Sequence, residues 1–143
     1  KRLKEKKKKF SPQEKIYIDR FLRPGIEIVF SQDLSKLANS CIDISDGLLG
    51  DLNHICEESK LGAKIYLEDI EFVGEYKNAL TWGDDYQLCF TASPKNLKKV
   101  YKMAKTHNIK ISNIGRMKKG KGISIFSNGK KIALKKAGYN HFK

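Results

Sequence analysis

The sequence predicts an α+β fold, a layered α/β/α domain with a mixed, mainly antiparallel sheet. Two observations lead to this fold class. Segments with helical spacing of apolar residues are interleaved with short segments in which apolar and polar residues alternate. The last two of these short segments are joined by Asn128-Gly129, a strong signal for a β-hairpin. A chain of 143 residues with 40% hydrophobic content is long enough for one compact domain.

The expected helices are placed by their end signals. Ser11-Pro12-Gln13-Glu14 combines an N-cap, a proline at the first helical position and a capping-box glutamate, and Pro24-Gly25 ends the helix that begins there. Ser93-Pro94 opens another helix. Beyond the first helix, the expected helices cover about 31–39, 46–59, 76–80 and 94–107.

Alternation with period two places the strands. In Cys41-Ile42-Asp43-Ile44-Ser45 it puts the two isoleucines toward the core and Asp43 and Ser45 together on the other face. The expected strands cover about 41–45, 63–67, 85–91, 110–116, 122–126 and 131–135.

The net charge of +13 is unevenly distributed. Residues 1–9 carry seven basic side chains and one acid, residues 10–94 carry seven basic and fifteen acidic, and residues 95–143 carry fifteen basic and no acid. The acids are therefore concentrated in the middle of the chain, which favours cation binding there. The basic ends allow the alternative that the chain is a nucleic-acid-binding module. However, nearly all the bases are lysines and no RNA- or DNA-binding motif is present, so nucleic acid is not expected as a partner.

Residues 1–22 are expected to form a basic segment and linker helix, and residues 23–143 the domain proper. Cys41, Cys56 and Cys89 are widely spaced and contain no CxxC pair, which is typical of buried cysteines in a reducing compartment. No apolar run approaches the ~20 residues of a membrane span, and the basic N-terminus lacks the apolar stretch of a secretory signal. A cytoplasmic location without membrane contact is therefore expected.

The segment Asp43-Ile44-Ser45-Asp46-Gly47 carries two carboxylates and a hydroxyl at an expected strand-to-helix turn. Carboxylates suit Mg²⁺, which takes one or two protein carboxylates together with phosphate oxygens. The serine hydroxyl and the amides at a helix N-terminus suit a phosphate. The alternative is structural: Ser45 or Asp46 is an ordinary N-cap, and Asp43 marks the strand edge.

Two further segments are candidates for binding. Trp82-Gly83-Asp84-Asp85-Tyr86 places adjacent acids after a glycine turn, where they repel each other unless a cation or hydrogen-bond donors satisfy them. Gly138-Tyr139-Asn140-His141-Phe142 offers aromatic rings and an imidazole for stacking on a ligand ring. The alternatives are an Asp-rich turn and a tail that packs against the core.

Together and in this order, these motifs resemble the C-terminal domain of bacterial thiamine-monophosphate kinases, within the aminoimidazole-ribonucleotide-synthetase-like superfamily. The resemblance runs from about residue 20 to the end of the chain. It is carried by Arg20-Phe21-Leu22-Arg23-Pro24, residues 42–51 (IDISDGLLGD), Gly62-Ala63, residues 83–90 (GDDYQLCF), Ile114-Gly115 and residues 138–142 (GYNHF).

The resemblance implies transfer of the γ-phosphoryl group of ATP to thiamine monophosphate, giving thiamine diphosphate, with Mg²⁺ between the phosphates. It implies that Asp43 and Asp46 ligate Mg²⁺ and that Ser45 contacts ATP. It also implies that Asp84 and Tyr139 contact thiamine monophosphate. Phosphoryl transfer depends mostly on positioning and charge neutralisation, which agrees with a turn rich in carboxylates.

The sequence departs from the family on the substrate side. Trp82 and Asp84 stand where the family usually has a glycine and a glutamate, and Gln87 and Asn140 where it has a glutamate and an aspartate. Family members also carry an N-terminal domain with further metal-binding aspartates, most of the ATP site and the dimer interface. The full-length protein is therefore expected to be a homodimer, and this part alone to be inactive. A regulatory domain that binds ligand without turnover is the remaining alternative.

Overall fold

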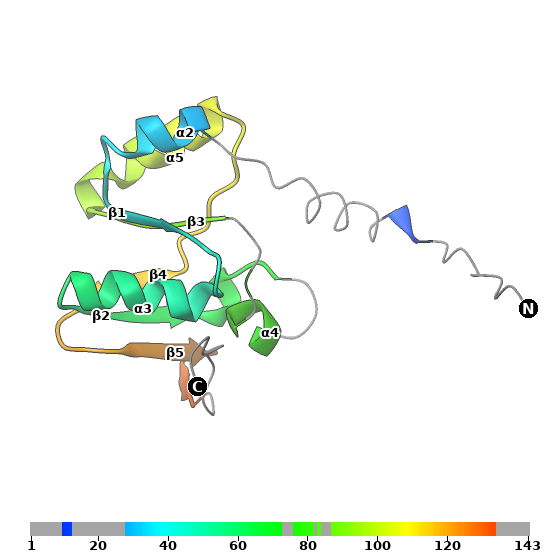
Figure 1. Ribbon diagram of the computed structural model, residues 1–143, viewed down its shortest axis with the longest axis vertical. Helices are drawn as coiled ribbons and strands as arrows, with labels where there is room; N and C mark the ends of the chain where they lie inside the picture. Colours follow the sequence, from blue (N-terminus) through cyan, green and yellow to red (C-terminus); the bar gives the residue numbers. More distant parts are fainter. Residues whose placement is uncertain (1–9, 13–27, 73–75, 82, 84–86, 134–143) are drawn as a thin grey trace, which may run out of the picture.

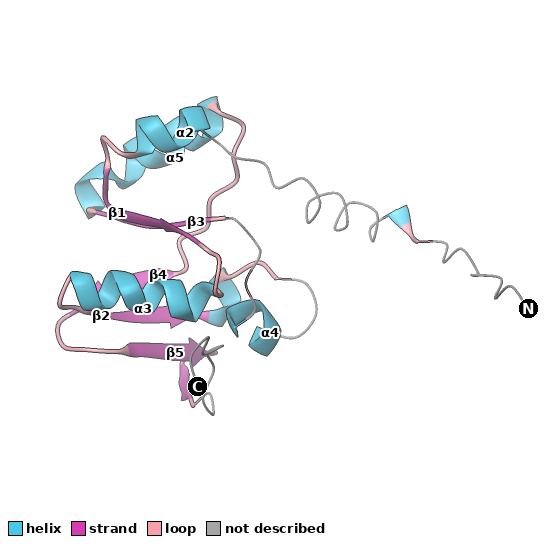
Figure 2. Ribbon diagram, viewed as in Figure 1, coloured by secondary structure: helices cyan, strands magenta, loops and turns pink. Residues whose placement is uncertain are grey.

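The computed structural model describes residues 10–12, 28–72, 76–81, 83 and 87–133. Within them the chain has the expected α+β architecture (Figures 1 and 2). The helix expected from Ser11 and the boundary expected at 22–23 fall outside the described residues, apart from the first residues of that helix. The elements are α2 (Ile28–Leu34), β1 (Ala38–Asp43), α3 (Leu48–Glu58), β2 (Gly62–Tyr66), a 3-10 turn (Leu67–Asp69), α4 (Tyr76–Thr81), β3 (Leu88–Ala92), a second 3-10 turn (Pro94–Asn96), α5 (Leu97–Thr106), β4 (Gly115–Lys118), β5 (Ile123–Ser127) and β6 (Lys130–Ile132).

The described strands form two sheets. β1 and β3 pair antiparallel, with Ile42 opposite Cys89. The second sheet has the order β4-β2-β5-β6, in which β2 runs antiparallel to β4 and parallel to β5. The mixed, mainly antiparallel pairing agrees with the sequence-based expectation, although the strands divide between two sheets.

The hairpin between β5 and β6 is confirmed. Ser127 and Lys130 face each other across it, and the two residues between them have positive φ angles, 49° at Asn128 and 75° at Gly129. Asparagine and glycine adopt this left-handed conformation at low cost, which allows a tight two-residue turn between twisted strands.

The larger hydrophobic core is built around α3, which contacts β1, β2, β3 and β5 (Figure 1). Its apolar residues recur at helical spacing, so they form one stripe along the helix. α4 closes one end of this core. The fully buried members are Leu48, Leu52, Ile55, Cys56, Ala63, Ile65, Leu67, Leu80, Cys89 and Ile125. The start of α3 is thereby fixed against both sheets.

A second core lies between the β1–β3 pair and the helices α2 and α5, which lie side by side (Figure 1). Its buried residues are Phe30, Leu34, Val100 and Ala104. Leu88 and Phe90 of β3 pack against this core, whereas Cys89 between them belongs to the larger one. Alternate side chains of a strand point to opposite faces. The β1–β3 pair therefore separates the two cores.

Polar contacts join the ends of α2 and α5. Asp33 Oδ2 lies 3.2 Å from His107 Nε2, and Asp33 Oδ1 accepts a hydrogen bond from Lys36 Nζ at 2.8 Å. The rings of Phe30 and His107 pack edge to face, with their centroids 5.9 Å apart. His107, the residue directly after α5, therefore contacts two residues of α2.

Some elements differ from the sequence-based expectation. α2 ends at Leu34 and not near residue 39, because Ala38 onward pairs with β3. Ser40 and Thr91 join the paired strands through their hydroxyls, 2.7 Å apart. Residues 110–114 are not a strand, since β4 begins only at Gly115. Within the described residues no helix is long and apolar enough to cross a membrane.

The expectation that all three cysteines are buried is wrong for one of them. Cys56 and Cys89 are buried, with 2% and 8% of their surface exposed, but Cys41 is exposed. Cys41 alternates with Ile42 along β1 and shares the outward pattern of Asp43. No disulfide joins the three thiols.

Candidate functional site

The turn from β1 to α3 carries the residues that the sequence singled out. Asp43 is the last residue of β1, and Ser45 and Asp46 form the bend before α3 (Figure 1). All three side chains are exposed. The amide of Ile44 donates to the carbonyl of Gln87 at 2.8 Å, so the backbone stays attached to the β3 side one residue past β1. Two carboxylates and a hydroxyl are therefore presented to solvent by a short, backbone-anchored segment.

The N-cap interpretation of this segment is wrong. The N-cap of α3 is Gly47, and no side-chain hydrogen bond caps the helix there. Gly47 has φ 99° and ψ 151°, a conformation that favours glycine. Ser45 and Asp46 thus do not serve as the helix cap, which removes the structural explanation for their presence.

Asp51, in the first turn of α3, supports this turn from inside. Only 2% of its surface is exposed. Its Oδ2 accepts hydrogen bonds from the amides of Ser45, at 2.9 Å, and Asp46, at 3.1 Å. The expectation that free amides at this turn meet a phosphate therefore does not hold for Ser45 and Asp46, because both already bind Asp51.

The backbone on either side of Trp82 packs directly beneath the same turn. A β-carbon at Gly83 would overlap the carbonyl oxygen of Ser45, and one at Gly47 would lie 2.7 Å from the carbonyl carbon of Thr81. The two candidate segments of the sequence are thus brought together at Ser45 and Gly83. Asp84 follows Gly83 directly, but Asp84 and Tyr139 lie outside the described residues.

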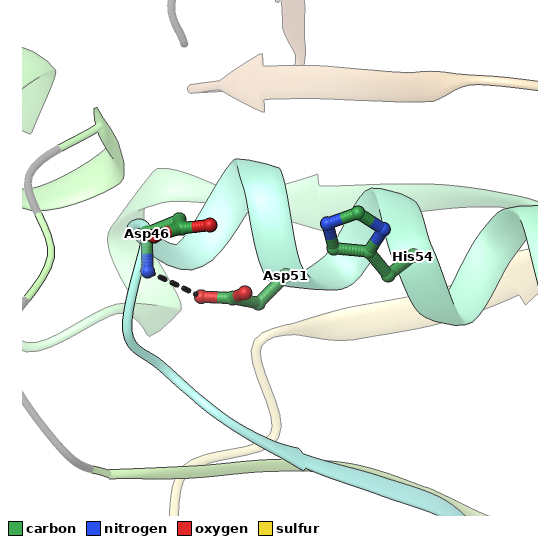
Figure 3. Close-up of side chains that lie close together, drawn as sticks. All are labelled: Asp46, Asp51 and His54. Carbon is green, nitrogen blue, oxygen red and sulfur yellow. Dashed lines mark hydrogen bonds between the residues drawn. The ribbon is translucent and has the colours of Figure 1, made fainter. Parts of the chain in front are cut away.

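Asp46, Asp51 and His54 form a cluster whose ligand atoms all lie within 4.8 Å of one another. In Figure 3 the Asp46 amide bonds to Asp51, and the His54 ring lies on the same side of α3 as both carboxylates. Asp46 and His54 are exposed. Carboxylate oxygens suit Mg²⁺, whereas an imidazole suits transition metals. The cluster is therefore rich in oxygen ligands, with one nitrogen at its edge.

Asp51 and His54 were not predicted as site residues, although the sequence carries a signal for Asp51. Leu48, Leu52 and Ile55 define the apolar stripe of α3, and Asp51 falls within it, three residues after Leu48. A carboxylate in an apolar stripe is expected to be buried and to need hydrogen-bond partners. His54 has only its helical spacing from Asp51 to indicate it.

Cys89 lies in the larger core close to this turn. Burial, with smaller contributions from the nearby Cys41, Asp51 and Cys56, raises the pKa of its thiol to about 11. Because the thiolate and not the thiol is the nucleophile, Cys89 does not act as one near neutral pH. It is a packing residue.

The fold and the turn define a class of protein that matches a known family. Residues 4–128 match the model of the AIR synthase related protein, C-terminal domain, and the chain belongs to that family. Likeness to the structure of T. maritima PurL complexed with ATP, at 14% identity and a TM-score of 0.61, agrees with this fold.

The relatives found by sequence are thiamine-monophosphate kinases. The chain is 43% identical to that of Buchnera aphidicola subsp. Schizaphis graminum and 38% identical to that of Escherichia coli K12, each over 87% of this chain. It is 34% identical to the Aquifex aeolicus enzyme over 95% of this chain. The matches cover 42%, 42% and 44% of these relatives, so the chain spans about two fifths of their length.

Solved structures of thiamine-monophosphate kinases also resemble this chain. AaThiL complexed with AMPPCP and TMP has a TM-score of 0.74 and 31% identity, covering 95% of this chain and 44% of that one. The thiamine-monophosphate kinase of Stenotrophomonas maltophilia has a TM-score of 0.69 and 31% identity, covering 80% of this chain and 39% of that one.

Proposed function

We propose that this chain is the C-terminal part of an enzyme that transfers the γ-phosphoryl group of ATP to thiamine monophosphate, giving thiamine diphosphate. The observation that carries the proposal is the turn after β1, where Asp43, Ser45 and Asp46 are exposed on a backbone held by Asp51. The similarity to thiamine-monophosphate kinases over most of the chain supports the choice of substrates.

In this proposal Asp43 and Asp46 hold Mg²⁺, and Ser45 contacts ATP. The donor set fits this cation, because both carboxylates are exposed and Mg²⁺ takes one or two protein carboxylates alongside water and phosphate oxygens. Bound Mg²⁺ would supply neutralisation of the phosphate charge. The chain itself presents these oxygens from a turn whose backbone is fixed, and such positioning is the main contribution that a protein makes to phosphoryl transfer.

For the other substrate we propose Asp84 and Tyr139 as contacts of thiamine monophosphate. The support for Asp84 is its position directly after Gly83, whose backbone packs against Ser45. The support for Tyr139 is the family resemblance of residues 138–142.

The proposal also covers the rest of the enzyme and its location. We propose an N-terminal domain that completes the ATP site, a homodimer formed through that domain, and a C-terminal domain beginning near residue 23. A cytoplasmic location fits three cysteines without a disulfide, since thiols stay reduced there.

Thiamine diphosphate formation by the full-length gene product, with ATP and Mg²⁺, tests the function. We expect turnover that depends on Mg²⁺ and is abolished by Asp46→Ala. Glu58→Ala is the control, because it removes an exposed acid at the far end of α3, away from the turn. Absence of turnover in the unsubstituted protein would reject the function, and normal turnover in Asp46→Ala would reject the metal assignment alone.

A further inference from the structure

Asp51 is a buried acid that the proposed ligand set does not use. Among the described residues, Asp51 is the one charged side chain that is buried, with 2% of its surface exposed. Removing a carboxylate from water costs free energy unless hydrogen bonds replace the lost hydration. Here the replacement comes from the turn itself, through the amides of Ser45 and Asp46.

These two hydrogen bonds determine which way the turn faces. Both amides point inward to one oxygen of Asp51, at 2.9 and 3.1 Å, while the side chains of Ser45 and Asp46 are exposed. Figure 3 shows the Asp46 amide directed at Asp51 and the Asp46 side chain leaving in another direction. The backbone could not rotate to bury these side chains without breaking both bonds.

Asp51 is itself held by the core. Asp51 lies between Leu48 and Leu52 on α3, and both leucines are buried in the larger core. On the other side of the turn, Gly83 leaves no room between its own backbone and the Ser45 carbonyl. The turn is thus held between the buried face of α3 and the backbone at Gly83.

We propose that Asp51 is a positioning residue for the cation site, which orients the Asp43–Asp46 segment by holding two of its amides and need not itself touch substrate. The link to catalysis rests on the function proposed above. The orientation of the turn does not rest on it.

The competing explanation is that Asp51 only stabilises the start of α3. An acid in the first turn of a helix is favourable in any case, because it faces the positive end of the helix dipole. The two explanations differ in their consequences. A purely structural role lowers thermal stability and leaves cation affinity unchanged in the protein that remains folded, whereas a positioning role lowers cation affinity in the folded protein.

Asp51→Asn in the full-length gene product separates the two, because asparagine keeps the volume but not the charge of the acceptor. The readout is Mn²⁺ affinity by electron paramagnetic resonance titration, with Asp46→Ala identifying the contribution of this site. We expect a loss of roughly 10–100-fold, the usual effect of removing a group that orients a metal ligand. Glu58→Gln, the same charge change on the exposed side of α3, should leave the affinity unchanged. Unchanged affinity in folded Asp51→Asn overturns the proposal.

Hydrogen exchange of residues 44–47 tests the orientation without any ligand. In the unsubstituted protein the Ser45 and Asp46 amides should be protected, and in Asp51→Asn their exchange should accelerate while the β5–β6 hairpin stays as protected as before. Fast exchange of both amides in the unsubstituted protein overturns the proposal even where Asp51→Asn fails to fold. Neither measurement requires turnover, so a failure of the proposed kinase function is seen separately, as absence of thiamine diphosphate.

Discussion

The α-carbon of Gly83 lies so close to the carbonyl oxygen of Ser45 that no β-carbon fits between them. Two segments that are far apart in the sequence are therefore in backbone contact at the candidate site. The contact explains a glycine at position 83 without any appeal to turn conformation.

Gly83→Ala is expected to destabilise the protein and displace the turn. The added methyl meets backbone, which does not move aside like a side chain, so a cost of about 1–3 kcal/mol or more is expected. Gly50→Ala is the matched control. A β-carbon there makes an ordinary contact, 3.6 Å from that of Asp46, and alanine in a helix interior stabilises by about 0.5–1 kcal/mol relative to glycine. Urea unfolding of both variants measures the contrast, and equal stability of the two would contradict the close approach.

Asp33 is expected to contribute a pH-dependent part of the stability. Its hydrogen bonds to Lys36 and His107 hold the pKa of its carboxyl below the ordinary value of 3.8. Because the folded-state pKa is the lower one, the contribution is present above pH 3.8 and is lost as the pH falls through the folded-state value. Asp33→Asn should therefore lower the melting temperature at neutral pH and have no effect in stronger acid. Thermal unfolding at a series of pH values measures this difference.

Glu58→Gln is the control for that series, since Glu58 is a solvent-exposed acid on a different helix. A melting-temperature difference for Asp33→Asn that persists unchanged at the acid end would show that the carboxyl does not stabilise through its charge.

The three cysteines are expected to differ in reactivity. Cys41 is exposed, while Cys56 and Cys89 are buried and the pKa of the Cys89 thiol is raised to about 11. Iodoacetamide near neutral pH should therefore alkylate Cys41 first and reach the other two only when the protein unfolds. Peptide mass spectrometry at increasing times gives the order, and early modification of Cys89 would contradict its packing in the core. Cys41→Ser, in which the remaining thiols should stay unmodified, is the matching control.

Local signals were enough to predict some elements. α3 has an apolar stripe and a glycine before it, and the β5–β6 hairpin has Asn128-Gly129, so each is specified by residues close together in the chain. The exposure of Asp43 and the partial burial of Ile42 also followed from alternation alone. These features do not depend on which distant strand lies alongside.

The remaining features depend on distant partners. Ala38 belongs to a strand only because β3 pairs with it, and its own neighbours are equally compatible with a longer α2. The role of Asp51 as a hydrogen-bond acceptor for the turn could not be predicted from its neighbours, because it arises only when the turn folds back over α3. The role of Gly83 was equally invisible, since its reason is the passing backbone of Ser45.

The position of β2 in its sheet has a consequence for the order in which the protein folds. Both neighbours of β2 come from residues 115–127, one of them as a parallel partner. During synthesis the ribosome therefore releases β2 well before any strand that can pair with it, and the intervening chain must be made before this sheet closes. Pairing over such separations is slow and leaves strand edges open for a time. A nascent chain that stalls before β5 exposes β2 to aggregation and to proteolysis, however well its site residues are preserved.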